Sequence, residues 1–483
     1  MTDRKTDLSR VGIVHLGVGA FFRAFGLPQI QRMQEKLSLV SANGWDVVGV
    51  SFRTANVRNL LAKNDFRYHA LELGITKNRL EEIKVLKEVY FLQEQRAEVM
   101  RVLASPEVKM VTLTISEKGY CYSLDTKTVD WGHPQIQEDL AFPEKPKSAP
   151  GLLLEALKNR RKMGIPSFSC VSCDNLSKNG NVLQTVVLDL ALKTDPSLAD
   201  WISQNTPFPS TMVDRIVPAI TVKETKKISN MTAWNDPAPV QHEPFFQWVI
   251  EDCFSPLPRP PLELAGVNFV KDVKPYEEMK LRLLNATHST IAYTGQLLKK
   301  ETVSQAIQHP VIANFIRNLW KFELRCSLEK PPDIDLDQYT SELLARYENP
   351  KLAHETLQIA MDGSKKLPPR ILAPLRSNLK ANRSINGLSI VVACWISFLV
   401  EKESSGKRIE INDPMRDILL VALKKTDIVR AILDIKEIFG RDLKKYKHFE
   451  TAVQGAYTLI ERIGLCECLK LYPDNINFTH SKP

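Results

Sequence analysis

Residues 11–22 read VGIVHLGVGAFF, and this stretch decides the fold of the N-terminal half. The apolar segment Val11–Leu16 is typical of a short buried strand, and it continues directly into Gly17-Val18-Gly19. A strand, a G-x-G turn and a helix form the arrangement that binds a dinucleotide. The first glycine permits the tight turn, and the second lets the backbone approach a pyrophosphate. Phe22 stands where the third glycine of the usual pattern would be, so the motif alone leaves an ordinary strand–turn–helix connection open.

A second strand is predicted at Trp45–Val50, about thirty residues further on, as a βαβ unit requires. The acidic residue expected at the end of this strand, where it would bind the adenine ribose, is missing. The chain continues with Ser51-Phe52-Arg53-Thr54 instead. Arg53 can face a 2′-phosphate or stack on adenine, so the sequence leaves the choice between NAD and NADP open.

Two more predicted strands end in polar residues. Met110–Ile115 runs into Ser116-Glu117-Lys118-Gly119, and Phe168–Ser172 runs into Cys173-Asp174-Asn175. The carboxyl ends of strands in open α/β sheets are where ligands bind. Asn175 can donate to a substrate oxygen, and its alternative role is an Asx turn. The candidate cofactor-binding residues are Val14, Leu16, Gly17, Val18, Gly19, Ala20, Phe21, Arg53 and Glu117.

Asp214 is a further candidate, because it follows a loop and can accept hydrogen bonds from substrate hydroxyls. Its alternative role is a local ion pair with Arg215, which is worth little if exposed. Prolines at 256, 258, 260 and 261 mark a nearby domain boundary, and beyond residue 275 the pattern is helical. We therefore expect a dinucleotide-binding domain over residues 1–274 and a mostly helical substrate and catalytic domain over residues 275–483.

The stretch EEMKLRLLNATHSTIAY, residues 277–293, is predicted to form one helix. At about 100° per residue, Glu277, Lys280 and His288 lie on one broad side, with Asn285 at its edge. Burial lowers the pKa of a lysine ammonium from about 10.4 toward ~7–8, where it can exchange a proton with an alcohol or carbonyl oxygen. The amide and the imidazole can hold that oxygen. Spacing alone equally allows a surface lysine among capping polar residues.

Residues 359–370 read IAMDGSKKLPPR, which predicts a basic loop between helices. Lys365, Lys366 and Arg370 are the candidates for binding a substrate carboxylate. On sequence alone, a solvated interhelix turn is the favoured interpretation.

The bulk composition is that of a globular protein. The 483 residues carry a formal net charge of +9, which suits an anionic cofactor or an acidic substrate. The basic residues are spread along the chain and do not alternate with aromatics, which disfavours a nucleic-acid partner. The N-terminus lacks an apolar stretch, and the longest apolar run, Leu388–Val400, is too short to span a bilayer and predicts a buried helix. We therefore expect a cytoplasmic protein without membrane association.

The sequence contains 8 cysteines. Cys170 and Cys173 have redox or zinc spacing, but the predicted strand Phe168–Ser172 argues otherwise, because residues three apart in a strand point to opposite faces. Cys466-x-Cys468 has the wrong spacing for a second zinc pair. We expect eight reduced thiols and no metal.

Taken together, several segments resemble the mannitol dehydrogenase family of polyol-specific long-chain dehydrogenases over nearly the whole chain. These segments are IVHLGVGAFFRA, SEKGYC, SCDN, MVDRIVP, EPFFQWVIED and KLRLLNATHS, the last with the family's K-x4-N-x2-H pattern. The resemblance implies a Rossmann-type N-terminal domain, a helical C-terminal domain and no metal.

The resemblance also implies residue roles. Lys280 would be the general acid/base, and Asn175 and Asn285 would polarise the reacting oxygen. Asp214 and His288 would position hydroxyls, and Glu277 would help handle the proton of the lysine. The family usually has histidine at the positions of Phe22 and Phe25, which implies altered cofactor contacts here.

Within the family, SEKGYC and QIAMDGSKKLPPR resemble the fructuronate reductases, also called D-mannonate oxidoreductases. The expected activity is oxidation of D-mannonate to D-fructuronate with NAD in hexuronate catabolism. Mannitol 2-dehydrogenase and a catalytically silent nucleotide-binding regulator are the alternatives. The expected partner is a small sugar acid or polyol, and a monomer and a small homo-oligomer both stay open.

Overall fold

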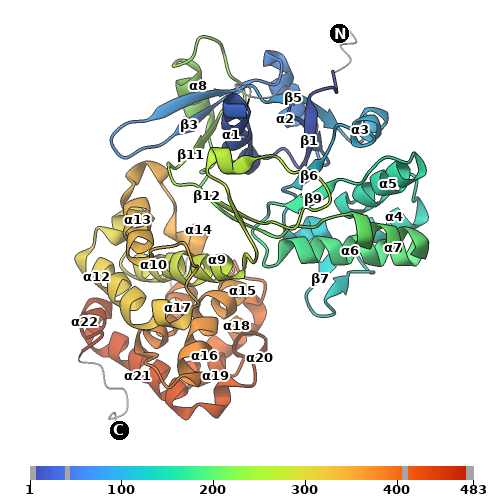
Figure 1. Cartoon of the computed structure of the whole chain (residues 1–483). Helices are drawn as coiled ribbons and strands as arrows, with labels where there is room; N and C mark the ends of the chain where they lie inside the picture. Colours follow the sequence, from blue (N-terminus) through green and yellow to red (C-terminus); the bar gives the residue numbers. More distant parts are fainter. Residues whose placement is uncertain (1–6, 38–43, 405–411, 475–483) are drawn as a thin grey trace. The chain divides into compact units, whose positions relative to one another are not determined.

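In the computed structural model of the chain, which describes residues 7–37, 44–404 and 412–474, two compact units divide between Lys274 and Pro275 (Figure 1). The N-terminal unit is an α/β structure, and the C-terminal unit consists mainly of helices. The predicted fold class, a Rossmann-type domain followed by a mostly helical one, is confirmed.

The N-terminal unit is built on a five-stranded sheet in which all neighbouring strands are parallel. The strand order is β5-β2-β1-β6-β9, so the chain leaves β1 first toward one edge and later returns to its other side. The strands are β1 (Val11–Leu16), β2 (Asp46–Ser51), β5 (Leu86–Phe91), β6 (Met110–Leu113) and β9 (Ser169–Ser172). Four of them lie where the sequence predicts strands.

Both faces of this sheet are buried against helices, which is why its strands β1, β2 and β6 are mostly apolar and buried along their whole length. Ile13 belongs to one hydrophobic core and Val14 to the other. One face carries α1 (Ala20–Leu37) and α2 (Asn56–Leu61), and the other carries α3 (Arg96–Leu103), α5 (Ala149–Lys162), α6 (Asn179–Thr194) and α7 (Pro196–Asn205).

Smaller sheets and helices complete the N-terminal unit, and several of these strands are too short for sequence periodicity to predict. One sheet contains β11 (Val240–His242), β3 (Tyr68–Glu72) and β4 (Arg79–Ile83), and another contains β10 (Thr211–Asp214), β12 (Gln247–Glu251) and β13 (Asn268–Val270). The remaining strands and α-helices among the described residues of this unit are β7 (Tyr122–Ser123), β8 (Thr128–Val129), α4 (Pro134–Ala141) and α8 (Val222–Ser229).

Helix α1 contains Pro28, which has no N–H and therefore leaves the carbonyl of Ala24 without its usual helical donor. The guanidinium of Arg215 replaces that donor. Its Nη1 donates to the Ala24 oxygen at 2.8 Å, and its Nε donates to the oxygen of Phe245 at 2.9 Å. Arg215 thus supplies the hydrogen-bond donor that Pro28 cannot provide within helix α1.

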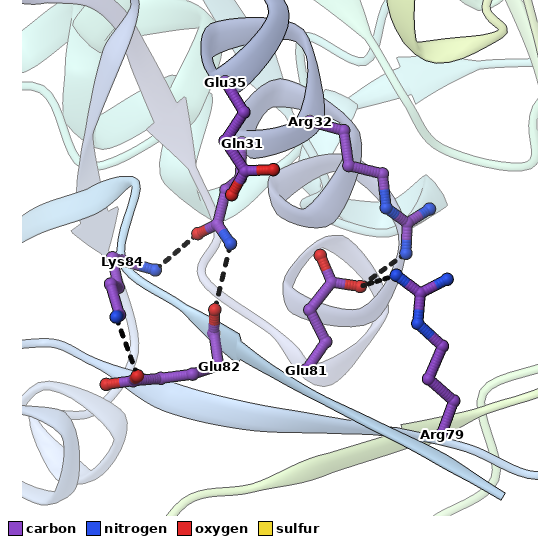
Figure 2. Close-up of a pocket in the computed structure, with 7 residues that line it drawn as sticks. All are labelled: Gln31, Arg32, Glu35, Arg79, Glu81, Glu82 and Lys84. Atoms are coloured by element: carbon purple, nitrogen blue, oxygen red, sulfur yellow. Dashed lines mark hydrogen bonds and ion pairs between the residues drawn. The ribbon is translucent and has the colours of Figure 1, made fainter.

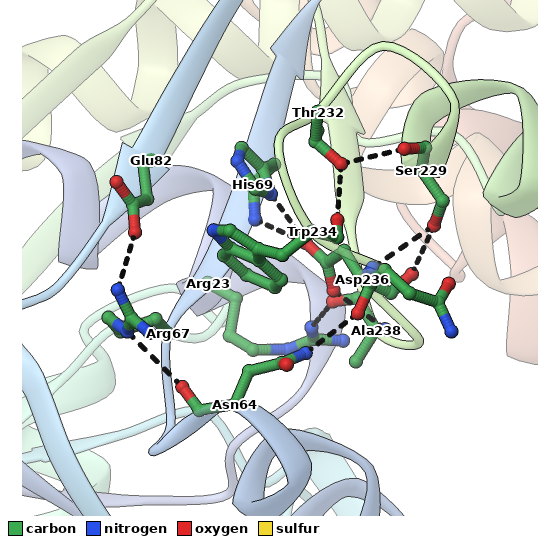
Figure 3. A network of polar contacts seen from close by, with 11 residues as sticks. Arg23, Asn64, Arg67, His69, Glu82, Ser229, Thr232, Trp234, Asp236 and Ala238 are labelled. Carbon is green, nitrogen blue, oxygen red and sulfur yellow. Dashed lines mark hydrogen bonds and ion pairs between the residues drawn. The ribbon is translucent and has the colours of Figure 1, made fainter.

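A polar network also ties α1 to the loop between α8 and β11 (Figure 3). Arg23 of α1 donates from Nη1 to the oxygen of Ala238 at 2.6 Å. The carboxylate of Asp236 accepts from the backbone N–H of His69 at 2.6 Å, and it lies 3.0 Å from Nδ1 of the same residue. The loop is therefore held by buried hydrogen bonds and not by apolar packing alone.

The C-terminal unit confirms the helical pattern predicted after residue 275. Its α-helices are α9 (Lys274–Met279), α10 (Ala286–Leu297), α11 (Val303–Ile307), α12 (Pro310–Leu319), α13 (Leu336–Glu348), α14 (Thr356–Ala360), α15 (Gly363–Leu367), α16 (Ala373–Lys380), α17 (Asn386–Ser404), α18 (Arg416–Leu423), α19 (Ile428–Leu433), α20 (Lys436–Phe439), α21 (Lys447–Ile463) and α22 (Leu465–Lys470). The apolar run Leu388–Val400 lies within α17.

In the described part of this unit, three segments are wound as π-helix: Lys280–Asn285, Trp320–Leu324 and Pro368–Leu372. The first packs against the other two. The predicted basic loop at 359–370 is therefore wrong, because α15 and the third π segment are helical. Pro368 and Pro369 stand where α winding changes to π winding, and a proline N lacking its hydrogen is tolerated in such a first turn.

Candidate functional site

The glycine turn after β1 has the two properties that a pyrophosphate site needs. Gly17 has φ +93°, and a Cβ there would lie 2.1 Å from the oxygen of Thr114, so no other residue fits. At Gly19 the nearest atom to a Cβ would be 3.9 Å away, which leaves its surface open to a ligand. The first turn of α1 follows at Ala20, and its N–H groups lack helical acceptors. The residues present fit a dinucleotide.

The turn lies at the carboxyl end of β1, between β2 and β6, where the strand order reverses direction. Open α/β sheets bind ligands at such a point. Of the predicted cofactor residues, Arg53, Glu117 and Ala20 are exposed, and Phe21 is half-buried. The side chains of Val14, Leu16 and Val18 are buried, so they shape the turn from below.

Asp174, which the sequence reasoning did not single out, holds the loop that follows β6. Its carboxylate accepts from the backbone N–H of Ile115 at 2.8 Å and of Ser116 at 3.0 Å, and from the hydroxyl of Tyr120 at 2.7 Å. Ser116 has φ 64° and ψ 159°, a conformation otherwise taken almost only by glycine. Burial raises the pKa of Asp174, against these hydrogen bonds. The neighbouring Asn175 is exposed at the end of the same strand connection.

Asp214 ends β10 and is only 4% exposed. The hydrogen bonds of Arg215 to Ala24, Phe245 and Pro244 all go to backbone carbonyls. The basic side chain next to Asp214 is thus occupied with α1 and its surroundings.

In the C-terminal unit, Glu277, Lys280, Asn285 and His288 are all buried, each at most 9% exposed. They lie on one continuous run of helical winding from Lys274 to Leu297, as predicted, but Lys280–Asn285 is the π segment. A π turn closes i→i+5 hydrogen bonds, so the assumed 100° per residue does not hold there. Such turns occur often at functional sites.

Side chains from two other helical elements donate to the carbonyls of this π segment. Trp320 donates from Nε1 to the oxygen of Leu283 at 3.0 Å, and the hydroxyl of Tyr347 donates to the oxygen of Leu284 at 3.0 Å. The widened turn is therefore held from two other helical elements.

His288 lies in a group of aromatic and basic side chains. Its ring stacks on Tyr347 with centroids 5.5 Å apart and meets the ring of His354 edge-on at 4.7 Å. Its Nε2 is buried without a hydrogen-bond partner, and so is Nδ1 of His354. Burial lowers the pKa of His288 well below 6.5, and His354 and the nearby cations lower it further.

The cations whose charges act on His288 are Arg370, Arg346 and Lys366, in decreasing order. Arg370 donates to the hydroxyl of Ser289 at 3.1 Å, and Lys366 donates to the oxygen of Ile359 at 3.0 Å. Burial lowers the pKa of Lys366, and Arg370 lowers it further. We call His288, His354, Lys366, Arg370 and Arg346 the basic cluster.

Lys365, the third predicted carboxylate-binding residue, is exposed and is not among the cations that act on His288. Sequence reasoning also missed His354 and Arg346. Arg346 is only 7% exposed although it lies on an amphipathic helix where an arginine is normally at the surface. Only tertiary packing identifies it.

A separate groove of about 490 Å³ lies beside α1 and β4 and is lined entirely by polar residues (Figure 2). Its charges are already paired with one another. Arg32 bonds Glu81 across the groove, and Lys84 lies 2.9 Å from Glu82. These pairs leave little charge for a ligand to satisfy, so the groove is not a candidate site.

The described ranges 7–37, 44–404 and 412–474 contain no group of three or more histidine, cysteine or acidic residues that could hold a metal ion. All eight cysteines are free thiols. Over the same ranges, none of the helices combines the length and the apolar character that crossing a bilayer requires.

Comparison with known proteins agrees with this geometry. The family model described as the mannitol dehydrogenase Rossmann domain matches residues 11–264, and that of the mannitol dehydrogenase C-terminal domain matches residues 272–461. The chain therefore belongs to the mannitol dehydrogenase family and is an oxidoreductase of that family.

Three relatives span nearly the whole chain. The D-mannonate oxidoreductase of Escherichia coli (strain K12) is 38% identical over 464 residues, covering 95% of this chain and 94% of the relative. The solved structure of Pseudomonas fluorescens mannitol 2-dehydrogenase in ternary complex with NAD and D-mannitol superposes with a TM-score of 0.81 at 32% identity, covering 96% and 95%. A D-sorbitol dehydrogenase in substrate-free form superposes with a TM-score of 0.88 at 29% identity, covering 96% of each chain.

Proposed function

We propose that this chain interconverts D-mannonate and D-fructuronate with NAD, as a fructuronate reductase. The basic cluster of the C-terminal unit carries this proposal. It combines buried and half-buried cations with two buried ring nitrogens that have no hydrogen-bond partner. The relative named D-mannonate oxidoreductase, at 38% identity over almost the full length, supports the same substrate class.

The charges of the basic cluster favour an anionic substrate. Cations withdrawn from water are stable only when opposite charge or hydrogen-bond acceptors compensate them. Asp362 and Asp413 act on Lys366, but the charges that act most strongly on His288 are basic. A substrate carboxylate supplies negative charge and accepts hydrogen bonds from these donors. A neutral polyol supplies only hydroxyls.

The residue roles follow from the chemistry of each group. NAD, when bound, supplies the hydride acceptor. We assign proton exchange with the reacting oxygen to the buried amine of Lys280. We assign the amides of Asn285 and Asn175 to donation toward the oxygen as negative charge develops on it.

The remaining predicted residues orient the substrate and the proton. His288 and Asp214 can bond sugar hydroxyls, because both are buried side chains with hydrogen-bonding capacity. Glu277 lies about one turn before Lys280 on the same helical run and is assigned to the transfer of its proton. We propose Lys366 and Arg370, together with His354 and Arg346, for the carboxylate, and we leave exposed Lys365 as a comparison residue.

Mannitol 2-dehydrogenase is the second candidate activity, because the structure of the Pseudomonas fluorescens enzyme with that function is similar over 96% of this chain. The two candidates differ in one substrate feature, the carboxylate at the end of the chain. The two activities also imply different roles for the basic cluster. In a mannitol dehydrogenase its cations would stabilise the fold and would not bind a substrate carboxylate.

The deciding experiment compares D-mannonate and D-mannitol as substrates with NAD. We expect kcat/KM for mannonate to exceed that for mannitol by roughly two orders of magnitude or more, the value of a charged hydrogen-bonding pair. Higher efficiency with mannitol would replace the proposal by the second candidate. Binding of NADH without turnover of either substrate would contradict both.

A pair of adjacent variants tests the carboxylate role directly. Lys366→Ala should raise KM for mannonate while leaving any mannitol oxidation nearly unchanged, because it removes a cation from the cluster. Lys365→Ala is the matched control, since it removes the same charge from an exposed position one residue away. Equal loss on both substrates in Lys366→Ala, or equal effects of the two variants, would argue against carboxylate recognition.

A further inference from the structure

His15, the fifth residue of β1, is only 1% exposed and uses both ring nitrogens. Nε2 lies 3.1 Å from the backbone oxygen of Gly17 and 3.0 Å from the hydroxyl of Thr114. Nδ1 lies 2.8 Å from the hydroxyl of Thr112. The imidazole thus sits directly beneath the glycine turn.

These contacts fix one tautomer. A backbone oxygen can only accept, so Nε2 carries the hydrogen and donates to Gly17. Nδ1 is then the acceptor for the hydroxyl of Thr112. Burial lowers the pKa of His15 to about 3, so the ring is neutral at ordinary pH and keeps this arrangement.

The ring of His15 is also held from above by Phe22 of α1. The two rings stack with centroids 3.5 Å apart and planes inclined by 6°. A Cβ at Gly26 would lie 2.3 Å from the phenyl ring, so glycine one turn later provides the space for it. Phe22 and Phe25 are both completely buried. Phe22 holds the histidine.

The oxygen of Gly17 receives three donors. Besides Nε2 of His15, it accepts from the N–H of Gly19 at 2.7 Å and from the hydroxyl of Thr114 at 2.8 Å. A carbonyl held by three donors is fixed toward the protein interior. A carbonyl rotated outward would instead present negative charge to a pyrophosphate at the start of α1.

We propose that His15 is a positioning residue for the dinucleotide: through the oxygen of Gly17, it holds the Gly17–Gly19 turn in the conformation that binds a pyrophosphate. This inference rests on the dinucleotide use proposed above. It concerns binding alone, so its test does not depend on which sugar is the substrate.

The test measures the Kd of NADH by fluorescence titration, without sugar substrate. His15→Phe keeps a planar ring against Phe22 but removes both nitrogens, and we expect Kd to rise roughly tenfold. Thr114→Val removes only a hydroxyl at nearly constant shape, and we expect a rise of roughly threefold to fivefold. Because both act on one carbonyl, the double variant should lose less than the product of the two effects. In turnover assays KM for NAD should rise while kcat at saturating NAD stays within about twofold.

His242→Phe is the matched control. His242 is a second buried imidazole of the same unit, with Nδ1 2.7 Å from the oxygen of Glu243, and it lies in the separate sheet of β11. It should destabilise the protein without changing the Kd of NADH. An unchanged Kd in Thr114→Val and in folded His15→Phe, with stability losses like those of His242→Phe, would overturn the inference. If His15→Phe does not fold, Thr114→Val decides alone. Failure of the wild-type protein to bind NADH would overturn the proposed function as well.

Discussion

Lys280 illustrates how a single side chain acquires its chemistry from its surroundings. It is 9% exposed, lies in a π segment and shares a helical run with Glu277, Asn285 and His288. The sequence was enough to predict that these four residues lie on one helical run. The π winding could not, because it depends on donors from Trp320 and Tyr347 that are distant along the chain.

Replacing this lysine provides the most direct test of the proposed proton transfer. Lys280→Ala should lower kcat for mannonate oxidation by roughly three orders of magnitude, since a positioned acid/base contributes that much. The Kd of NADH should stay close to that of the wild type. Turnover within tenfold of the wild type would refute the assigned role, and lost NADH binding would indicate a structural role instead.

The buried histidines make a second prediction, on stability and pH. Burial and, to a lesser extent, Arg215 lower the pKa of His242 to about 3. The unfolded chain binds a proton near pH 6.5 whereas the folded one does not, so this group's stabilising contribution is fully present above about pH 6.5 and is lost as pH falls toward 3. His15 behaves in the same way.

In chemical denaturation between about pH 5.0 and about pH 6.5, the wild-type free energy of unfolding should therefore fall with decreasing pH. His242→Phe should reduce that slope by up to about 1.4 kcal/mol per pH unit, the value for one proton. An unchanged slope would mean that His242 titrates normally in the folded protein.

At the scale of elements, the main parallel strands and the apolar helix α17 could be predicted, because burial on both sides produces continuous apolar runs. The short strands β7, β8 and β11 could not, since two or three residues carry no periodicity. Pro368-Pro369 was misleading for a physical reason. Prolines normally mark loops, but here the missing hydrogens fall at the start of a π turn.

Pro28 in α1 gives a prediction at this scale. Arg215→Met should destabilise the protein by about 2–4 kcal/mol, because it removes the donor to the buried carbonyl of Ala24 and the donor to the half-buried carbonyl of Phe245. In a Pro28→Ala background the backbone N–H restored at this position can bond the Ala24 oxygen again. The loss should then be smaller by about 1 kcal/mol. Additive effects in urea denaturation would show that Arg215 does not substitute for the missing helical donor.

The whole chain has a formal net charge of +9. In the structure, three of its cations lie together in the basic cluster: Arg370, Arg346 and Lys366. The sequence points to candidate residues but not to their neighbours. Lys366 and Arg370 prove to act on His288, Lys365 is exposed, and His354 and Arg346 emerge only from packing. Spacing within 359–370 could not separate the half-buried lysine from the exposed one.

Because the protein carries net positive charge, the salt dependence of KM should distinguish an anionic substrate from a neutral one. With NAD saturating, KM for mannonate should rise several-fold between ~20 mM and ~300 mM NaCl, because salt screens the attraction of an anion to a positive field. KM for uncharged mannitol should change less than about twofold over the same range. A flat response for mannonate would mean that the field of the protein does not assist its capture.

Phe22 and Gly26 restrict which residues can replace each other's side chains. No methyl group can be added at 26 while the ring remains, since the two would overlap at 2.3 Å. Exchange of Phe22 for a smaller or differently shaped residue should therefore precede any enlargement at 26, and the reverse order of mutations would pass through a strained intermediate. Engineering of this cofactor turn has to treat the two sites as one unit.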